Sequence, residues 1–126
     1  ERDEFDVATV IVGRWSEFTT FIPIYYVDKK QHMYIMANAE SLPQADKIMI
    51  DKFMNKFAQY ARAEGGEVTI FEFLDNDGAR NVNQKLVNFL RALQQDINKT
   101  GIEDLDLDFK SDNIMIWDGN MVMVDW

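Results

Sequence analysis

Two segments with helical periodicity lie between two segments with strand periodicity, and this order limits the folds that the chain can adopt. Helical spacing of apolar residues runs over 43–62 and 79–99, and hairpin patterns occupy 21–36 and 114–124. Apolar residues recur every 3.6 positions on one face of a helix and every second position on one face of a strand. The sequence therefore predicts an α+β fold with two long helices between two hairpins.

Each hairpin pattern contains its own turn signal. In the first, the β-rich runs 21–27 and 32–36 flank a short polar stretch. Pro23 indicates that its strand lies at a sheet edge or begins there, because proline cannot donate a backbone hydrogen bond. In the second, Asp118-Gly119 separates the two runs, and this dipeptide is typical of a tight hairpin turn.

The two helical segments carry end signals. Ser41 and Gln44 have the spacing of a capping box, with Pro43 in the first turn, so we expect the first helix to begin there. Gly65 and Gly101 follow the two periodic segments, at positions where glycine commonly ends a helix.

Two further segments are less sharply defined. Residues 3–13 fit a short helix, although their β-branched side chains make a strand a real alternative. Residues 67–74 are apolar without a decisive period, and the sequence leaves their secondary structure open.

Length, composition and charge restrict the class of protein. A chain of 126 residues with 47% hydrophobic residues fits one domain, 1–126, with a packed core. The net charge of −9 argues against a surface for the phosphate backbone of nucleic acids. No apolar run reaches the roughly 18 residues of a membrane span, so we expect no membrane interaction. The chain has no cysteine, which excludes disulfides and thiolate chemistry.

Acidic residues concentrate in 101–126, where seven of them stand against Lys110 as the one basic residue. Within this stretch, Asp108 and Asn113 form a D-x-x-x-x-N pattern, followed by the second hairpin and Asp125. That arrangement is typical of phosphoryl transfer. The first aspartate orients the attacking hydroxyl, while the asparagine and the last aspartate hold magnesium, which neutralises phosphate charge.

The segment 106–126 resembles the catalytic loop and metal-binding segment of the protein-kinase-like superfamily. It is most similar to phage serine/threonine protein kinases and to aminoglycoside phosphotransferases. The resemblance implies ATP and Mg²⁺ as cofactors. The residues that it assigns are Asp108 as catalytic base, Lys110 as a contact of the transferring phosphate, and Asn113 and Asp125 as magnesium ligands.

The resemblance also implies a division of the single domain. Residues 1–36 would be a remnant of the N-terminal lobe, with the opening helix as its regulatory helix, and 41–126 would be part of the helical C-terminal lobe. Residues 37–40 would be the hinge between them. The hinge residues whose backbone groups would meet the adenine are Ala37, Asn38, Ala39 and Glu40.

The implied activity is ATP- and Mg-dependent transfer of the γ-phosphate to a hydroxyl group, on a protein serine or threonine in preference to a small molecule. A protein substrate or partner is therefore expected, with no direct binding of nucleic acid. If the protein is of phage origin, the expected location is the cytoplasm of a bacterial host.

Several positions depart from the family pattern. Asp106 stands where the family usually has histidine, and the 126 residues include no glycine-rich phosphate loop and no strand lysine. Lys29 and Lys30 fall in a predicted turn, and His32, the only histidine, is expected at the surface. We therefore expect the chain to be a fragment of the enzyme, and its own activity stays open. The alternative is a catalytically inactive, acidic pseudokinase-like module that binds or inhibits a partner.

Overall fold

The computed structural model describes residues 4–78, 80, 82–102 and 107–125. Its strands are β1 (Ile24–Asp28), β2 (Met33–Met36), β3 (Glu40–Ser41), β4 (Ile114–Trp117) and β5 (Asn120–Met123). Its helices are α1 (Glu4–Ile11), α2 (Gln44–Ala63), α3 (Ile70–Phe73) and α4 (Gln84–Thr100). Short helical turns span Trp15–Glu17, Leu74–Gly78 and Ser111–Asn113.

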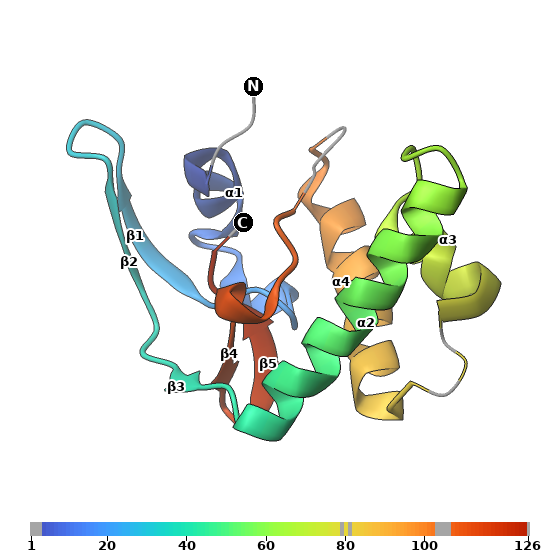
Figure 1. Cartoon of the computed structure of the whole chain (residues 1–126). Helices are drawn as coiled ribbons and strands as arrows, with labels where there is room; N and C mark the ends of the chain where they lie inside the picture. Colours follow the sequence, from blue (N-terminus) through green and yellow to red (C-terminus); the bar gives the residue numbers. More distant parts are fainter. Residues whose placement is uncertain (1–3, 79, 81, 103–106, 126) are drawn as a thin grey trace.

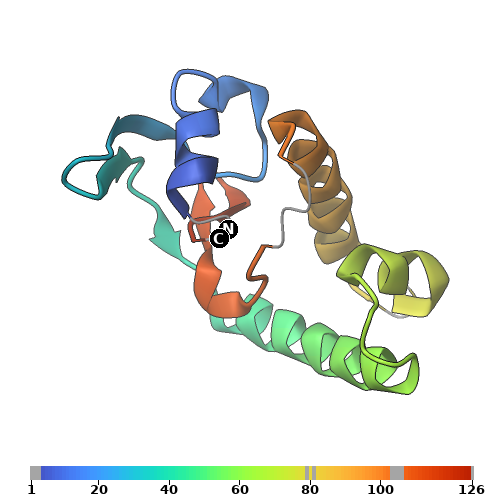
Figure 2. The ribbon, with the colours of Figure 1, turned by 90° about the horizontal axis from the view of Figure 1, so that it is seen from above.

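Two small antiparallel sheets combine with these helices, which confirms the α+β class. The β1–β2 hairpin stands at one side of the domain, α2 and α4 lie at the other, and β4–β5 lies between them (Figure 1). Seen from above, the C-terminal hairpin and the loop before it are surrounded by α1, α2 and α4 (Figure 2). None of the helices in the described part of the chain combines the length and the apolar character that a membrane crossing requires.

The first hairpin forms as predicted, with β1 antiparallel to β2. It begins at Ile24 rather than at Phe21, because Phe21 instead forms a parallel bridge with Met123 of β5. Pro23 directly precedes β1, where its missing N–H costs the sheet no hydrogen bond. His32 is exposed, as expected, but it lies in the turn and not on the second strand, which begins at Met33.

The second sheet has the order β3-β4-β5, and its first strand was not predicted. β3 pairs with Met115 and Ile116 of β4. The predicted capping box is therefore wrong. Ser41 belongs to β3, and α2 begins at Gln44 behind Pro43, without a side-chain cap.

The turn between β4 and β5 agrees with the prediction. Asp118 and Gly119 have φ angles of 52° and 79°, and two positive φ angles are what a type I′ turn requires. Trp117 pairs with Asn120 across this turn, so β5 begins one residue earlier than expected.

The boundaries of the remaining helices follow from their caps. α4 begins at Gln84 rather than near residue 79, because the side chain of Asn83 accepts the N–H of Lys85 at 2.8 Å. Gly101 ends α4 with a φ of 69°, as predicted. Residues 67–74, whose secondary structure the sequence left open, contain α3. Thr69 caps this helix by accepting a hydrogen bond from the Glu72 N–H. Residues 4–11 are helical, which decides against a strand there.

The core lies where the inner faces of α1, α2 and α4 meet the central hairpin. The apolar stripe predicted for α4 is buried along most of its length, and β5 buries residues 121–123. Large side chains that are fully buried include Ile11, Ile24, Ile50, Leu86, Leu90, Leu93 and Met123. This burial is the main favourable contribution to the stability of the fold.

One carboxylate is buried in this core and connects α4 to the segment before β1. Asp96 is 1% exposed, and its Oδ2 accepts the N–H groups of Thr19 and Thr20 at 2.9 and 2.7 Å. The hydroxyl of Thr20 donates to the same oxygen at 2.7 Å. The carbonyl of Thr20 in turn accepts the N–H of Met123, and the N–H of Ile22 donates to the carbonyl of Met123 at 3.0 Å. Asp96 therefore fixes the segment on which β5 is aligned.

We predict that Asp96→Ala lowers the free energy of unfolding by about 2–4 kcal/mol, because it leaves buried donors of Thr20 without an acceptor. Asp96→Asn keeps an acceptor oxygen and should cost less. Urea unfolding followed by circular dichroism measures both. Asp75→Ala is the control, since Asp75 forms an exposed ion pair with Arg91, worth at most about 1 kcal/mol. Equal losses for Asp96→Ala and Asp75→Ala would contradict the structural role of Asp96.

Candidate functional site

Asn113 joins the loop before β4 to the chain after β5. Its side-chain nitrogen donates to the backbone carbonyl of Asp108 at 2.8 Å, and its backbone carbonyl accepts the N–H of Val124 at 2.9 Å. Asn113 is 6% exposed. The 3₁₀ turn that ends at Asn113 sets this geometry, with the Asn113 N–H donating to the carbonyl of Lys110 at 3.0 Å. The loop before β4 and the chain after β5 therefore meet at one buried residue, which bonds the first through its side-chain amide and the second through its backbone carbonyl.

The loop is also held from two helices. The hydroxyl of Ser111 donates to Asp51 of α2 at 2.8 Å, and Ser111 is buried. Phe109 is buried as well, with its ring centroid 6.3 Å from that of Phe89 on α4. The backbone around Asp108 is thus anchored on both sides of the domain.

The charged side chains of this loop face solvent. Lys110 Nζ lies 3.3 Å from Asp108 Oδ2, and the two side chains are 54% and 65% exposed. Asp125 is also exposed and directly follows Val124, which is bonded to Asn113. Of the predicted site residues, the structure connects Asp108, Asn113 and the residue next to Asp125 in one chain of hydrogen bonds. Asp106 lies outside the described residues.

The predicted hinge connects the two sheets. Ala37 is buried and its N–H donates to the carbonyl of Pro23 at 3.0 Å. Asn38 and Ala39 belong to no strand, whereas Glu40 is the first residue of β3 and is paired with β4. Only the end of the hinge segment, at Glu40, therefore lies beside the strand that follows Asn113.

We call Asn113, together with its bonds to Asp108 and Val124, the Asn113 junction. The side-chain oxygens at this junction have the chemistry that magnesium prefers. Asn113 offers an amide oxygen and Asp125 a carboxylate, both hard ligands. Because the amide nitrogen of Asn113 is bonded to the carbonyl of Asp108, the amide oxygen is the atom left to accept or ligate. Within the described ranges no three side chains of His, Cys, Asp or Glu are grouped to hold a metal by themselves. These two residues fit Mg²⁺ when further oxygens come from a nucleotide's phosphates.

Two carboxylates that shape the site were missed from the sequence. Asp51 lies on the exposed face of α2, and nothing in the sequence distinguishes it from its polar neighbours. Asp96 could have been found, since it follows Leu93 by three positions and so falls on the apolar stripe of α4. An acidic residue at a core-facing position implies a set of donors around it.

A second group of charges flanks the Asp96 contact. Lys99 Nζ lies 3.0 Å from the backbone carbonyl of Glu17, and the Glu17 side chain accepts a hydrogen bond from Arg14 Nε at 3.1 Å. This hydrogen bond lowers the pKa of the Glu17 carboxyl and raises the pKa of Arg14. Both side chains are exposed, so the pair adds little to stability.

Comparison with known proteins gives no match: no protein-family model, no curated protein and no solved structure is significantly similar to the chain. The geometry of the site is therefore the basis for assigning a function.

We predict that Asn113→Ala lowers the free energy of unfolding by about 1–2 kcal/mol, because it removes a buried hydrogen bond to the loop. Asp108→Ala should change it by less than about 0.5 kcal/mol, because its carboxylate makes an exposed ion pair. Thermal and urea unfolding of the two variants test this difference. If Asp108→Ala were the more destabilising change, Asn113 would not be the residue that holds the loop.

Proposed function

We propose that the chain carries the catalytic loop and magnesium-binding segment of a protein-kinase-like phosphotransferase. The intact enzyme transfers the γ-phosphate of Mg-ATP to a hydroxyl group, on a protein in preference to a small molecule. The Asn113 junction is the observation that supports this best, because it joins the backbone of Asp108 to the residue before Asp125. Phosphoryl transfer requires a base and metal ligands around one phosphate, even when they are far apart in sequence.

Each residue has a role that its surroundings allow. Asp108 is the general base, since its exposed carboxylate can accept the proton of an incoming hydroxyl. Lys110, whose ammonium lies 3.3 Å from that carboxylate, contacts the phosphate that is transferred. Asn113 and Asp125 hold Mg²⁺ through oxygen atoms, and Mg²⁺, when bound, neutralises the charge of the phosphates.

The position of the hinge is consistent with a nucleotide that reaches these residues. The connector 37–40 follows β2, and Glu40 pairs with Ile116 of β4. β4 begins directly after Asn113. An adenine at this connector would meet the backbone of Asn38 and Ala39, because the Ala37 N–H is bonded to Pro23 and Glu40 is paired with β4.

We predict that Mg²⁺ and ATP together raise the melting temperature of the chain by a few degrees. A ligand at about ten times its Kd stabilises the native state by about 1.4 kcal/mol, which corresponds to roughly 3–6 °C in a domain of this size. Mg²⁺ alone should do less, because it usually needs phosphate oxygens to complete its shell. A thermal-shift titration with Mg²⁺, ATP and both together measures the effect.

Asp125→Asn and Asp118→Asn are the matched variants for this experiment. Both remove one exposed carboxylate from the C-terminal hairpin region, but Asp118 lies in the β4–β5 turn. Asp125→Asn should abolish most of the stabilisation by Mg-ATP, and Asp118→Asn should leave it nearly intact. If both variants responded like the parent chain, the acidic cluster would be only a solvated surface and the phosphotransferase proposal would fail.

A second candidate function, a non-catalytic module that binds a partner, is favoured by the β1–β2 hairpin. This two-stranded ribbon stands at the side of the domain (Figure 1). Large apolar side chains that it exposes are Tyr25, Tyr26, Met33, Ile35 and Met36, each between 39% and 51%. Exposed apolar groups of this extent on one element are typical of interaction surfaces.

We predict that Ile35→Lys leaves the free energy of unfolding within about 0.5 kcal/mol of the parent value, because Ile35 contributes to a surface and not to the core. Ile24→Lys on the neighbouring strand is the contrast, since Ile24 is completely buried and a charge there should prevent folding or cost several kcal/mol. Urea unfolding compares the two. A large loss for Ile35→Lys would show that the apolar ribbon serves the fold of this domain and would remove the support for a binding surface.

A further inference from the structure

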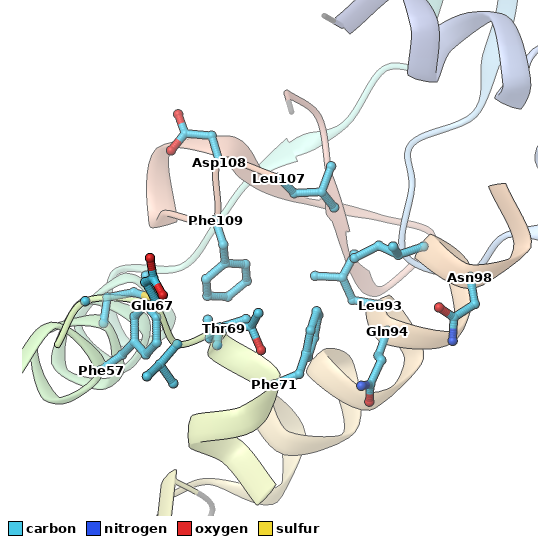
Figure 3. A pocket seen from close by; sticks show the side chains of 15 residues that line it. Phe57, Glu67, Thr69, Phe71, Leu93, Gln94, Asn98, Leu107, Asp108 and Phe109 are labelled. Carbon is cyan, nitrogen blue, oxygen red and sulfur yellow. The ribbon is translucent and has the colours of Figure 1, made fainter. Parts of the chain in front are cut away.

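A cavity of about 740 Å³ lies between α2, α4, the segment 66–71 and the loop 107–109 (Figure 3). Its volume falls in the range of about 300–1,000 Å³ that is usual for ligand sites. Asn113 does not line it, but the neighbouring loop residues Leu107, Asp108 and Phe109 do.

The walls of the cavity are aromatic and held in place from outside. Phe57, Phe71 and Phe109 line it, and Figure 3 shows the ring of Phe109 directed toward Thr69 and Phe71. Phe109 is supported from behind by the Phe89 ring at 6.3 Å. The remaining apolar lining includes Leu93, which is 1% exposed. The cavity is therefore preformed, and an apolar group entering it meets fixed ring faces and edges.

The charged groups at the cavity are all of one sign. Among the described residues that line it, Glu67 and Asp108 are acidic and none is basic. The carboxylate of Asp108 points away from the Phe109 ring, to the outside of the cavity (Figure 3). Lys110 is paired with it, but through an exposed contact of little strength. An apolar interior with an acidic margin attracts a molecule that is apolar at one point and positively charged around it.

We propose that this cavity binds one large apolar side chain from a basic segment of a partner protein. The apolar side chain fills the space between the phenylalanine rings. Lysine or arginine residues beside it in the partner's sequence meet Glu67 and Asp108 outside the cavity, where a peptide chain crossing the opening can reach them. Such binding requires neither ATP nor Mg²⁺, so it does not depend on phosphoryl transfer.

The test uses a pentapeptide with one phenylalanine between two pairs of arginines, titrated into the chain with ¹³C-labelled isoleucine and leucine methyl groups. We expect saturable shifts at Leu93, Ile97 and Leu107, which line the cavity, and none at Ile35 on the distant hairpin. Replacing the phenylalanine of the peptide with glycine should weaken binding at least about tenfold, because one buried aromatic side chain is lost.

Glu67→Lys and Glu64→Lys are the matched variants of the protein. Both positions are exposed, but only Glu67 lines the cavity. Glu67→Lys should raise the Kd about fivefold, and Glu64→Lys should change it less than about twofold. Equal effects of the two variants, shifts confined to residues outside the cavity, or no saturable binding would each overturn the proposal. Shifts of the cavity methyl groups that follow protein concentration without peptide would identify a second copy of the chain as the occupant instead.

Discussion

The carboxylate of Asp96 is the contact on which the position of the C-terminal hairpin depends. It accepts hydrogen bonds from Thr19 and Thr20. The carbonyl of Thr20 and the N–H of Ile22 are in turn bonded to the N–H and the carbonyl of Met123 in β5. A buried carboxylate is stable only where donors surround it, so the segment before β1 is restricted to the conformation that supplies them. Asp96 of α4 consequently aligns β5, although its hydrogen bonds go to Thr19 and Thr20 and not to β5 itself.

The hairpin aligned in this way carries the loop 107–113 at a fixed place. Three different contacts hold that loop: Asn113 to the chain after β5, Ser111 to Asp51 of α2, and Phe109 to α4. Each uses a buried member of the loop, whereas the exposed members are Asp108, Lys110 and Asp112. The buried anchors therefore fix the backbone that carries the exposed charges, which the catalytic role proposed for Asp108 and Lys110 would require.

Local patterns predicted much of this architecture, and contacts between distant residues account for what they missed. The helical periods located α2 and most of α4, and Asp118-Gly119 located the second turn. β3 has two residues and exists because β4 lies beside it, so no periodicity could reveal it. At the site, Asp108 and Asn113 are close in the sequence, so their spacing could be recognised from the sequence alone. The bond from Val124 to Asn113 depends on how the hairpin closes, which spacing alone does not determine.

Adjacent residues of the loop 107–109 face two surfaces of different chemistry. Phe109 is buried and lines the apolar cavity, whereas Asp108 extends into solvent on the other side (Figure 3). The N–H of Phe109 donates to the carbonyl of Leu107 at 3.0 Å, which closes a tight turn at Asp108, so one short segment supplies both a wall and a charge. A side chain that enters the cavity against Phe109 therefore contacts the same short segment that carries Asp108.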